Sequence, residues 1–165
     1  MLADKLGVKF YDKEIISLTS KESGLSNKYI ESLDQKGTTK YESSNEDRIF
    51  IAEEKVVKNL SKESCIIVGR CADYILKDNK DVLKVFLYTN DNDKVKRAVN
   101  YYGLSEKSAL KEIKKINKLR EKHYNYYTNQ KWHDFNNYDL AINVDKIGID
   151  GTVNLIIDTL NIKDR

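Results

Sequence analysis

The segment from Cys65 to Leu76 constrains the fold more than any other part of the sequence. It opens with four apolar residues, Cys-Ile-Ile-Val, a run that is typical of a strand buried on both faces of a parallel sheet. Gly69 ends the run, Arg70 follows directly, and apolar residues then return with helical spacing. A strand that turns into a helix at a glycine places its next side chains at the carboxyl end of a sheet, where open α/β folds bind ligands.

Arg70 and Asp73 are the two side chains that this turn would present. The guanidinium group carries a fork of donors that matches phosphate oxygens, so Arg70 is a candidate phosphate ligand. The alternative is an ordinary surface arginine beside a buried strand. The sequence of this segment leaves both interpretations open.

The rest of the chain continues the alternation of strands and helices. Short strands are predicted at 8–11, 65–68, 82–88 and 140–144. Helices are predicted at about 12–23, from 26, and at 46–61, 90–102, 105–123 and 151–160, with a Thr- and Ser-rich loop at 37–45. The helix at 46–61 carries an apolar stripe formed by Ile49, Ala52, Val56 and Leu60. Asn90 is predicted to cap the helix at 90–102, and Gly103 to end it. Strands separated by helices predict a single α/β domain with a parallel sheet and right-handed crossovers.

Composition limits the class of protein and its compartment. Charged residues make up 33% and hydrophobic residues 40% of the 165 residues, a normal balance for one globular domain. No apolar run is long enough to cross a membrane, and no secretory signal is visible. Cys65 and Cys71 lack the spacing of metal ligands or of a disulfide framework. We therefore expect a reduced, cytoplasmic protein with no protein metal site.

A basic block at 94–133 accounts for the positive net charge. It contains eleven Lys and Arg against three Glu, a local charge of +8. Part of this charge lies on one face of the helix predicted at 105–123, at Lys111, Lys114, Lys118 and Lys122. Aromatic residues then alternate with basic and amide residues at 123–133. The block could be a solvated face, or it could attract a nucleotide, a nucleic acid or an acidic protein surface, and composition does not choose among these.

Seven segments carry a family resemblance in their order along the chain. They are Leu6–Glu14, Lys21–Ser26, Ile67–Leu76, Tyr102–Ser105, Tyr126–Thr128, Gln130–Trp132 and Asn137–Leu140. With these segments the chain resembles the cytidylate-kinase-like family, relatives of the bacterial CMP kinases among the P-loop nucleoside monophosphate kinases. The resemblance implies a three-layer, P-loop kinase-like α/β fold, with a lid formed by the basic helix and aromatic loop at about 105–138. Because such a lid accounts for the basic block, nucleic acid is the least favoured partner.

The resemblance also implies an activity and residues that would perform it. The γ-phosphoryl group of ATP would pass to CMP or a similar nucleotide with the help of Mg²⁺. Asp12 would lie in the nucleoside monophosphate site, although it is equally suited to cap the helix that follows it. Arg70 would grip the acceptor phosphate, and Asp73 would hold Arg70 or the acceptor nucleoside. The candidate catalytic residues are Arg97, Lys118 and Arg120.

Family members begin with a strand, a glycine-rich phosphate loop and a helix, which the resemblance places upstream of Met1. None of the seven glycines has the spacing of a phosphate-binding loop. The absent strand would lie between those at 65–68 and 82–88, so its loss would leave two apolar edges open to strand addition from a second copy. We therefore expect little ATP-dependent activity from these residues alone, and an inactive nucleotide-binding module is the alternative.

Overall fold

The structure is a computed structural model that describes residues 1–36 and 43–163 and divides into two compact units. The β1–β2 unit contains Ala3–Val82 and Leu119–His133. The β3–β4 unit contains Met1–Leu2, Leu83–Lys118 and Asp134–Arg165. The single domain with a lid at about 105–138 stays a prediction.

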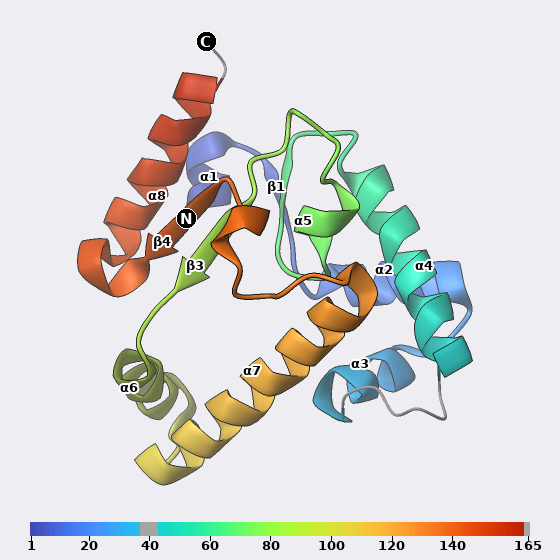
Figure 1. The fold of residues 1–165 in the computed structure, drawn as a ribbon, viewed down its shortest axis with the longest axis horizontal. Helices are drawn as coiled ribbons and strands as arrows, with labels where there is room; N and C mark the ends of the chain where they lie inside the picture. The colour runs from blue at the N-terminus through green and yellow to red at the C-terminus, as the bar shows by residue number, and fades with distance from the viewer. Residues whose placement is uncertain (37–42, 164–165) are drawn as a thin grey trace. The chain divides into compact units, whose positions relative to one another are not determined.

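Each unit contains one pair of short parallel strands (Figure 1). In the first, β1 (Lys9–Tyr11) pairs with β2 (Cys65–Ile67), and Tyr11 lies opposite Ile67. In the second, β3 (Val85–Tyr88) pairs with β4 (Leu140–Asn143). All four strands lie inside the ranges predicted from the sequence, and helices separate them along the chain. The α/β class is therefore confirmed.

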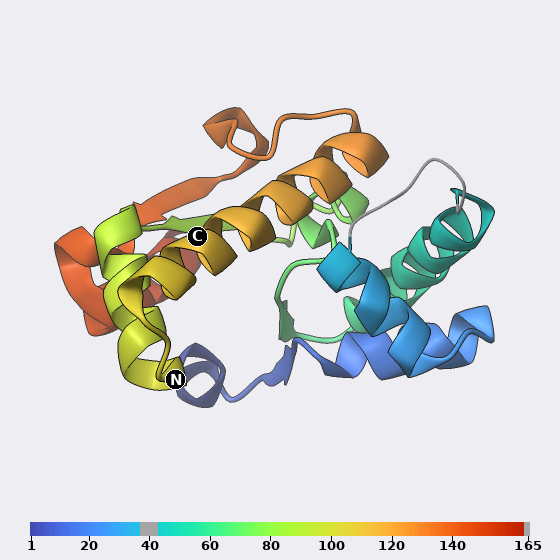
Figure 2. The ribbon, with the colours of Figure 1, turned by 90° about the horizontal axis from the view of Figure 1, so that it is seen from below.

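The helices of the β1–β2 unit build its core. They are α2 (Glu14–Ser23), α3 (Asn27–Lys36), α4 (Ser43–Leu60) and α5 (Ala72–Ile75). The short helix α1 (Leu2–Leu6) precedes them and has no buried residue. Helix α2 packs against both α3 and α4, and Figure 2 shows α2 and α3 side by side. Ile15, Ile30 and Val57 are the largest apolar side chains that are fully buried there.

Two local predictions for this unit were wrong. Asp12 does not cap α2: Lys13 occupies the N-cap position, and the Asp12 carboxylate accepts no hydrogen bond from the residues that the structure describes. The apolar stripe of α4 was predicted to include Val56, but Val57 is the buried residue. Helix α4 also begins at Ser43, inside the predicted loop at 37–45, whose other residues, 37–42, lie outside the described ranges.

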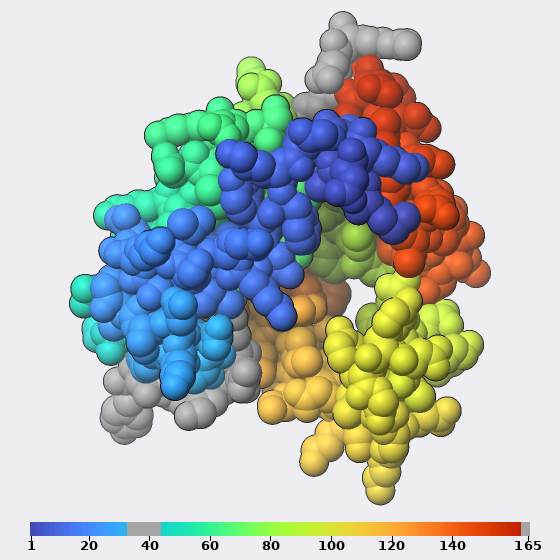
Figure 3. Space-filling view, turned by 180° about the vertical axis from the view of Figure 1, so that it is seen from behind, coloured from blue at the N-terminus to red at the C-terminus, as the bar shows by residue number. Residues whose placement is uncertain are grey.

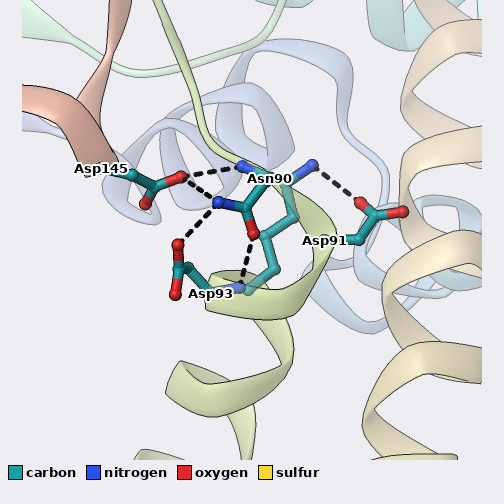
Figure 4. A network of polar contacts seen from close by, with 5 residues as sticks. Asn90, Asp91, Asp93 and Asp145 are labelled. Atoms are coloured by element: carbon teal, nitrogen blue, oxygen red, sulfur yellow. Dashed lines mark hydrogen bonds and ion pairs between the residues drawn. The ribbon is translucent and has the colours of Figure 1, made fainter.

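The β3–β4 unit contains α6 (Asp91–Tyr102), the first part of α7 (Glu106–Thr128), the 3-10 helix η1 (Phe135–Asn137) and α8 (Val144–Lys163). As predicted, Asn90 caps α6: its side-chain oxygen accepts a hydrogen bond from the Asp93 amide at 3.0 Å (Figure 4). The turn between α6 and α7, yellow in Figure 3, is open to solvent, and Tyr101 and Tyr102 are each 78% exposed.

Two helices are longer than predicted. Helix α7 continues to Thr128, so the first half of the aromatic segment at 123–133 is helix rather than loop. Helix α8 starts directly after β4, at Val144, and Gly148 breaks it with a φ of 72° and a ψ of 177°. Within the described ranges, no helix has the length and apolar character needed to cross a membrane.

Candidate functional site

The turn after β2 is the most unusual backbone feature of the β1–β2 unit. The Val68 amide still donates a hydrogen bond to the Tyr11 carbonyl at 3.0 Å, so the end of β2 lies beside the end of β1. Gly69, Arg70 and Cys71 then follow with φ values of 77°, 58° and 54°. The Ile75 amide then donates a hydrogen bond to the Cys71 carbonyl at 2.9 Å, and this bond closes the first turn of α5.

Three consecutive left-handed residues make this turn costly. Glycine adopts the conformation freely, but each residue with a side chain is destabilised by about 1–2 kcal/mol. Such strain persists where the surroundings hold it in place, and it gathers at ligand-binding and catalytic sites. The turn 69–71 is therefore the strongest backbone indication of a functional site in this unit.

Cys71 contributes packing rather than reactivity to the turn. Its side chain is buried, and burial, together with the nearby charge of Asp73, raises the pKa of its thiol. A thiol with a raised pKa stays protonated at neutral pH and is a poor nucleophile. This leaves Arg70 and Asp73 as the residues of the turn with useful chemistry.

Arg70 is held by a glutamate from another helix. Its Nη1 donates a hydrogen bond to Oε1 of Glu53 on α4 at 3.0 Å. The Arg70 side chain is 16% exposed, whereas Glu53 is fully buried. A buried carboxylate needs a charged or hydrogen-bonding partner, and this one fixes the direction of the guanidinium group.

Asp73 is held from a different helix. The hydroxyl of Tyr124 on α7 donates a hydrogen bond to Oδ2 of Asp73 at 2.6 Å. The same hydroxyl lies 3.1 Å from Oε1 of Gln130. Thr128 secures this arrangement, because its Oγ1 donates to the Tyr124 carbonyl at 2.6 Å and accepts from the Gln130 amide at 3.1 Å. The Gln-Lys-Trp segment thus packs next to the turn.

Asp12 lies at the end of β1, beside the strand that leads into this turn. Its carboxylate is exposed, and among the described residues its side chain makes no hydrogen bond or ion pair. Asp12, Arg70 and Asp73 therefore share the β1–β2 unit. The structure brings Arg70 and Asp73 together in one turn and places Asp12 at the neighbouring strand end.

The candidate catalytic residues lie on the helices of the basic block. Arg97 is on α6 in the β3–β4 unit, and Lys118 and Arg120 are on α7, on either side of the boundary between the units. All three side chains are exposed, and none forms a hydrogen bond or ion pair with any residue that the structure describes. Such side chains are available to bind an anion.

Glu53 and Tyr124 are residues of this site to which the sequence analysis gave no role. A signal for Glu53 was present, since it follows Ile49 by four positions and lies inside the buried stripe of α4. A charged residue in such a stripe is rarely buried without a partner. Tyr124 had no comparable signal, because it is one of several aromatic residues in its segment.

Comparisons with known proteins identify a family and a related structure. A model described as the cytidylate kinase-like family matches residues 1–146, a range that contains all the candidate residues. The crystal structure of an uncharacterized protein from Eubacterium ventriosum is similar, with a TM-score of 0.77 and 29% sequence identity. That similarity covers 97% of this chain and 86% of the other. No protein with a curated description matches significantly.

Proposed function

The chain belongs to the cytidylate kinase-like family, and we propose that it is a nucleoside monophosphate kinase-like protein. Its acceptor is CMP or a similar nucleotide, and the γ-phosphoryl group of ATP is the group transferred. The observation that carries this proposal is the strained turn after β2, in which Arg70 is held in one orientation by the buried Glu53. A fixed guanidinium group at the end of a parallel strand suits the recognition of a phosphate.

The acceptor nucleotide makes its contacts along the ends of β1 and β2. Arg70 binds the phosphate of the acceptor, because Glu53 holds its guanidinium group in one orientation and the geometry of a guanidinium group matches phosphate oxygens. Asp73 orients the nucleoside or supports Arg70. Asp12 accepts hydrogen bonds from the sugar or the base, and its exposed carboxylate supports this role.

The negative charge of the reacting phosphates requires more cations than Arg70 alone supplies. Glu53 compensates the positive charge of Arg70, and Asp73 adds a negative charge nearby. Phosphoryl transfer spreads negative charge over the transferred group, and catalysis depends mainly on positioning the substrates and neutralising that charge. We assign this neutralisation to Lys118 and Arg120, with Arg97 as a third cation. Their exposure and lack of ion pairs among the described residues support the assignment.

ATP and Mg²⁺ are the cofactors that this reaction requires. When bound, they supply the phosphoryl group and neutralise the charge that develops on it. Mg²⁺ at such sites is held largely by substrate phosphates and water, with one or two carboxylates. Among the described residues no cluster of three or more metal-ligating side chains occurs. The exposed cations of α7 fit the binding of phosphates.

Two measurements test the proposal. Isothermal titration calorimetry compares CMP binding by the wild-type protein and by Arg70→Ala. Arg48→Ala is the matched control, because Arg48 is an exposed arginine on α4 in the same unit. A coupled assay then measures ATP-dependent phosphorylation of CMP, UMP, AMP and GMP in the presence of Mg²⁺.

We expect CMP binding to be lost in Arg70→Ala and kept in Arg48→Ala. Phosphorylation of any of the four nucleotides supports the kinase, and binding without turnover supports the inactive nucleotide-binding module. If the wild-type protein neither binds nor phosphorylates a nucleoside monophosphate, the proposed function is wrong.

A further inference from the structure

Glu53 is a fully buried carboxylate in the middle of a long helix. It lies on α4 among apolar neighbours such as Ile49 and Val57, and its Oε1 is 3.0 Å from Nη1 of Arg70. A residue selected for packing at this position would be apolar, because the cost of removing two charges from water largely offsets their attraction. A role in stability alone therefore does not account for a glutamate here.

The position of Arg70 shows what the glutamate does to its partner. Arg70 lies in the left-handed region with a φ of 58°, between Gly69 and Cys71. An unheld arginine on a short turn would sample many rotamers, since its side chain has several rotatable bonds. The contact with Glu53 selects the rotamers that point the guanidinium group toward α4.

We propose that Glu53 is a positioning residue, which orients the guanidinium group of Arg70 for the phosphate of the acceptor nucleotide. This inference rests on the proposed function and deepens it, because it makes the phosphate, rather than the base or sugar, the part of the ligand that depends on Glu53. The residue acts through Arg70 and does not touch the ligand itself.

Charge and orientation predict opposite effects for the variant Glu53→Gln. Removing a negative charge beside an anion site favours anion binding, so charge alone predicts tighter binding of CMP. Loss of the ion pair leaves Arg70 less firmly oriented, so positioning predicts weaker binding. The sign of the change in CMP affinity therefore separates the two effects.

The experiment is calorimetry with CMP and with cytidine, which lacks the phosphate. The variants are Glu53→Gln and Glu53→Asp, and the second keeps the charge but shortens the side chain by one methylene group. Glu54→Gln is the matched control, because Glu54 is the next residue on α4 and pairs with Lys58 at the surface. Circular dichroism and thermal unfolding show which variants are folded.

We expect both Glu53 variants to bind CMP about tenfold or more weakly, the effect of losing one charge-assisted hydrogen bond. Cytidine binding and the Glu54→Gln control should change less than about twofold, well below the effect of one such bond. A folded variant that binds CMP as tightly as the wild type, or more tightly, overturns the inference. So does an equal loss for CMP and cytidine, which indicates a structural role.

The remaining outcomes are also decisive. If Glu53→Gln is unfolded, Glu53→Asp is judged by the same two criteria. If neither variant folds, Glu53 is required for stability and the inference is wrong. If the wild-type protein binds no nucleoside monophosphate, the proposed function fails and this inference fails with it. If the wild type binds CMP and the Glu53 variants bind it equally well, only this inference is wrong.

Discussion

Tyr124 donates a hydrogen bond of 2.6 Å to the carboxylate of Asp73, and this bond joins α7 to the strained turn after β2. Tyr124 is 4% exposed, so the carboxylate accepts this hydrogen bond in a site largely shielded from water. A hydrogen bond to a charged group under these conditions is stronger than one between neutral groups. Tyr124 therefore holds Asp73, and Glu53 holds Arg70, in the same turn.

Replacing Tyr124 with phenylalanine tests this contact, because only the hydroxyl group is removed. We expect the free energy of unfolding to fall by about 1–2 kcal/mol, as Asp73 loses a hydrogen-bond donor. Urea denaturation followed by circular dichroism measures the change. Tyr126→Phe is the matched control: Tyr126 is on the same helix and 57% exposed, so its variant should differ from the wild type by less than about 0.5 kcal/mol. Equal stability of the two variants would contradict the prediction.

A second hydrogen-bonded junction lies in the β3–β4 unit, where Asn90 follows β3. Oδ2 of Asp145 accepts hydrogen bonds from the Asn90 backbone amide at 2.9 Å and from its side-chain amide at 3.0 Å (Figure 4). The same asparagine caps α6 through the Asp93 amide. Asn90 therefore connects the start of α6 to the start of α8.

We expect Asn90→Ala to lower the free energy of unfolding by about 1–2 kcal/mol, the cost of a lost helix cap together with the bond to Asp145. Asn100→Ala is the control, because Asn100 is an exposed residue near the end of α6. Alanine favours helix there, so this variant should be as stable as the wild type or slightly more stable. Chemical denaturation measures the free energy of unfolding of both variants. An equal loss of stability in the control would show that the cap does not cause the destabilisation of Asn90→Ala.

The two cysteines should differ in reactivity. Burial raises the pKa of both thiols, but Cys71 is buried whereas Cys65 is only partly so. The folded protein therefore favours the protonated form of Cys71. This contribution to stability is fully present below the pKa of an unfolded thiol, about 8.5, and it is lost progressively as the pH rises above that value.

Iodoacetamide labelling between pH 7 and pH 9, followed by peptide mass spectrometry, measures this difference. We expect Cys65 to react in the folded protein and Cys71 to react only after the addition of urea. The two sites serve as controls for each other, since both are in the same molecule. Equal labelling rates in the absence of urea would show that the turn at Cys71 opens freely.

Local signals explain which parts of the fold could be predicted from the sequence. Asn90 and Gly103 mark the start and end of α6 through chemistry that involves only neighbouring residues, and both predictions were correct. Asp12 carried the same kind of signal but did not cap α2, because Lys13 occupies the N-cap position and the Asp12 carboxylate accepts no hydrogen bond from the described residues. The residue type alone therefore indicates a possible cap but does not fix which residue takes the N-cap position.

The site was only partly predictable for a different reason. Arg70 and Asp73 are close in the sequence and next to a glycine, so their strand-to-helix turn could be recognised directly. Their partners could not, because Glu53 lies 17 residues from Arg70 and Tyr124 lies 51 residues from Asp73 along the chain. Such pairings depend on how helices pack. Even within α4 the predicted stripe was correct at Ile49 and Ala52 but named Val56 where Val57 is the buried residue.

The exposed side of β3 leads to a last prediction, on self-association. Strand β3 pairs with β4 alone among the described residues, and Leu87 on β3 is 53% exposed, although strands of parallel sheets are normally covered. An open apolar strand favours pairing with a second copy of the chain, and a lysine on such a strand opposes it.

Size exclusion with light scattering measures this self-association. We expect the mass of the wild type to rise with concentration and the mass of Leu87→Lys to stay that of a monomer. Ile162→Lys is the control, because Ile162 is 71% exposed but lies on α8. A wild-type protein that is monomeric at every concentration, or a control that dissociates as Leu87→Lys does, would rule out association through β3.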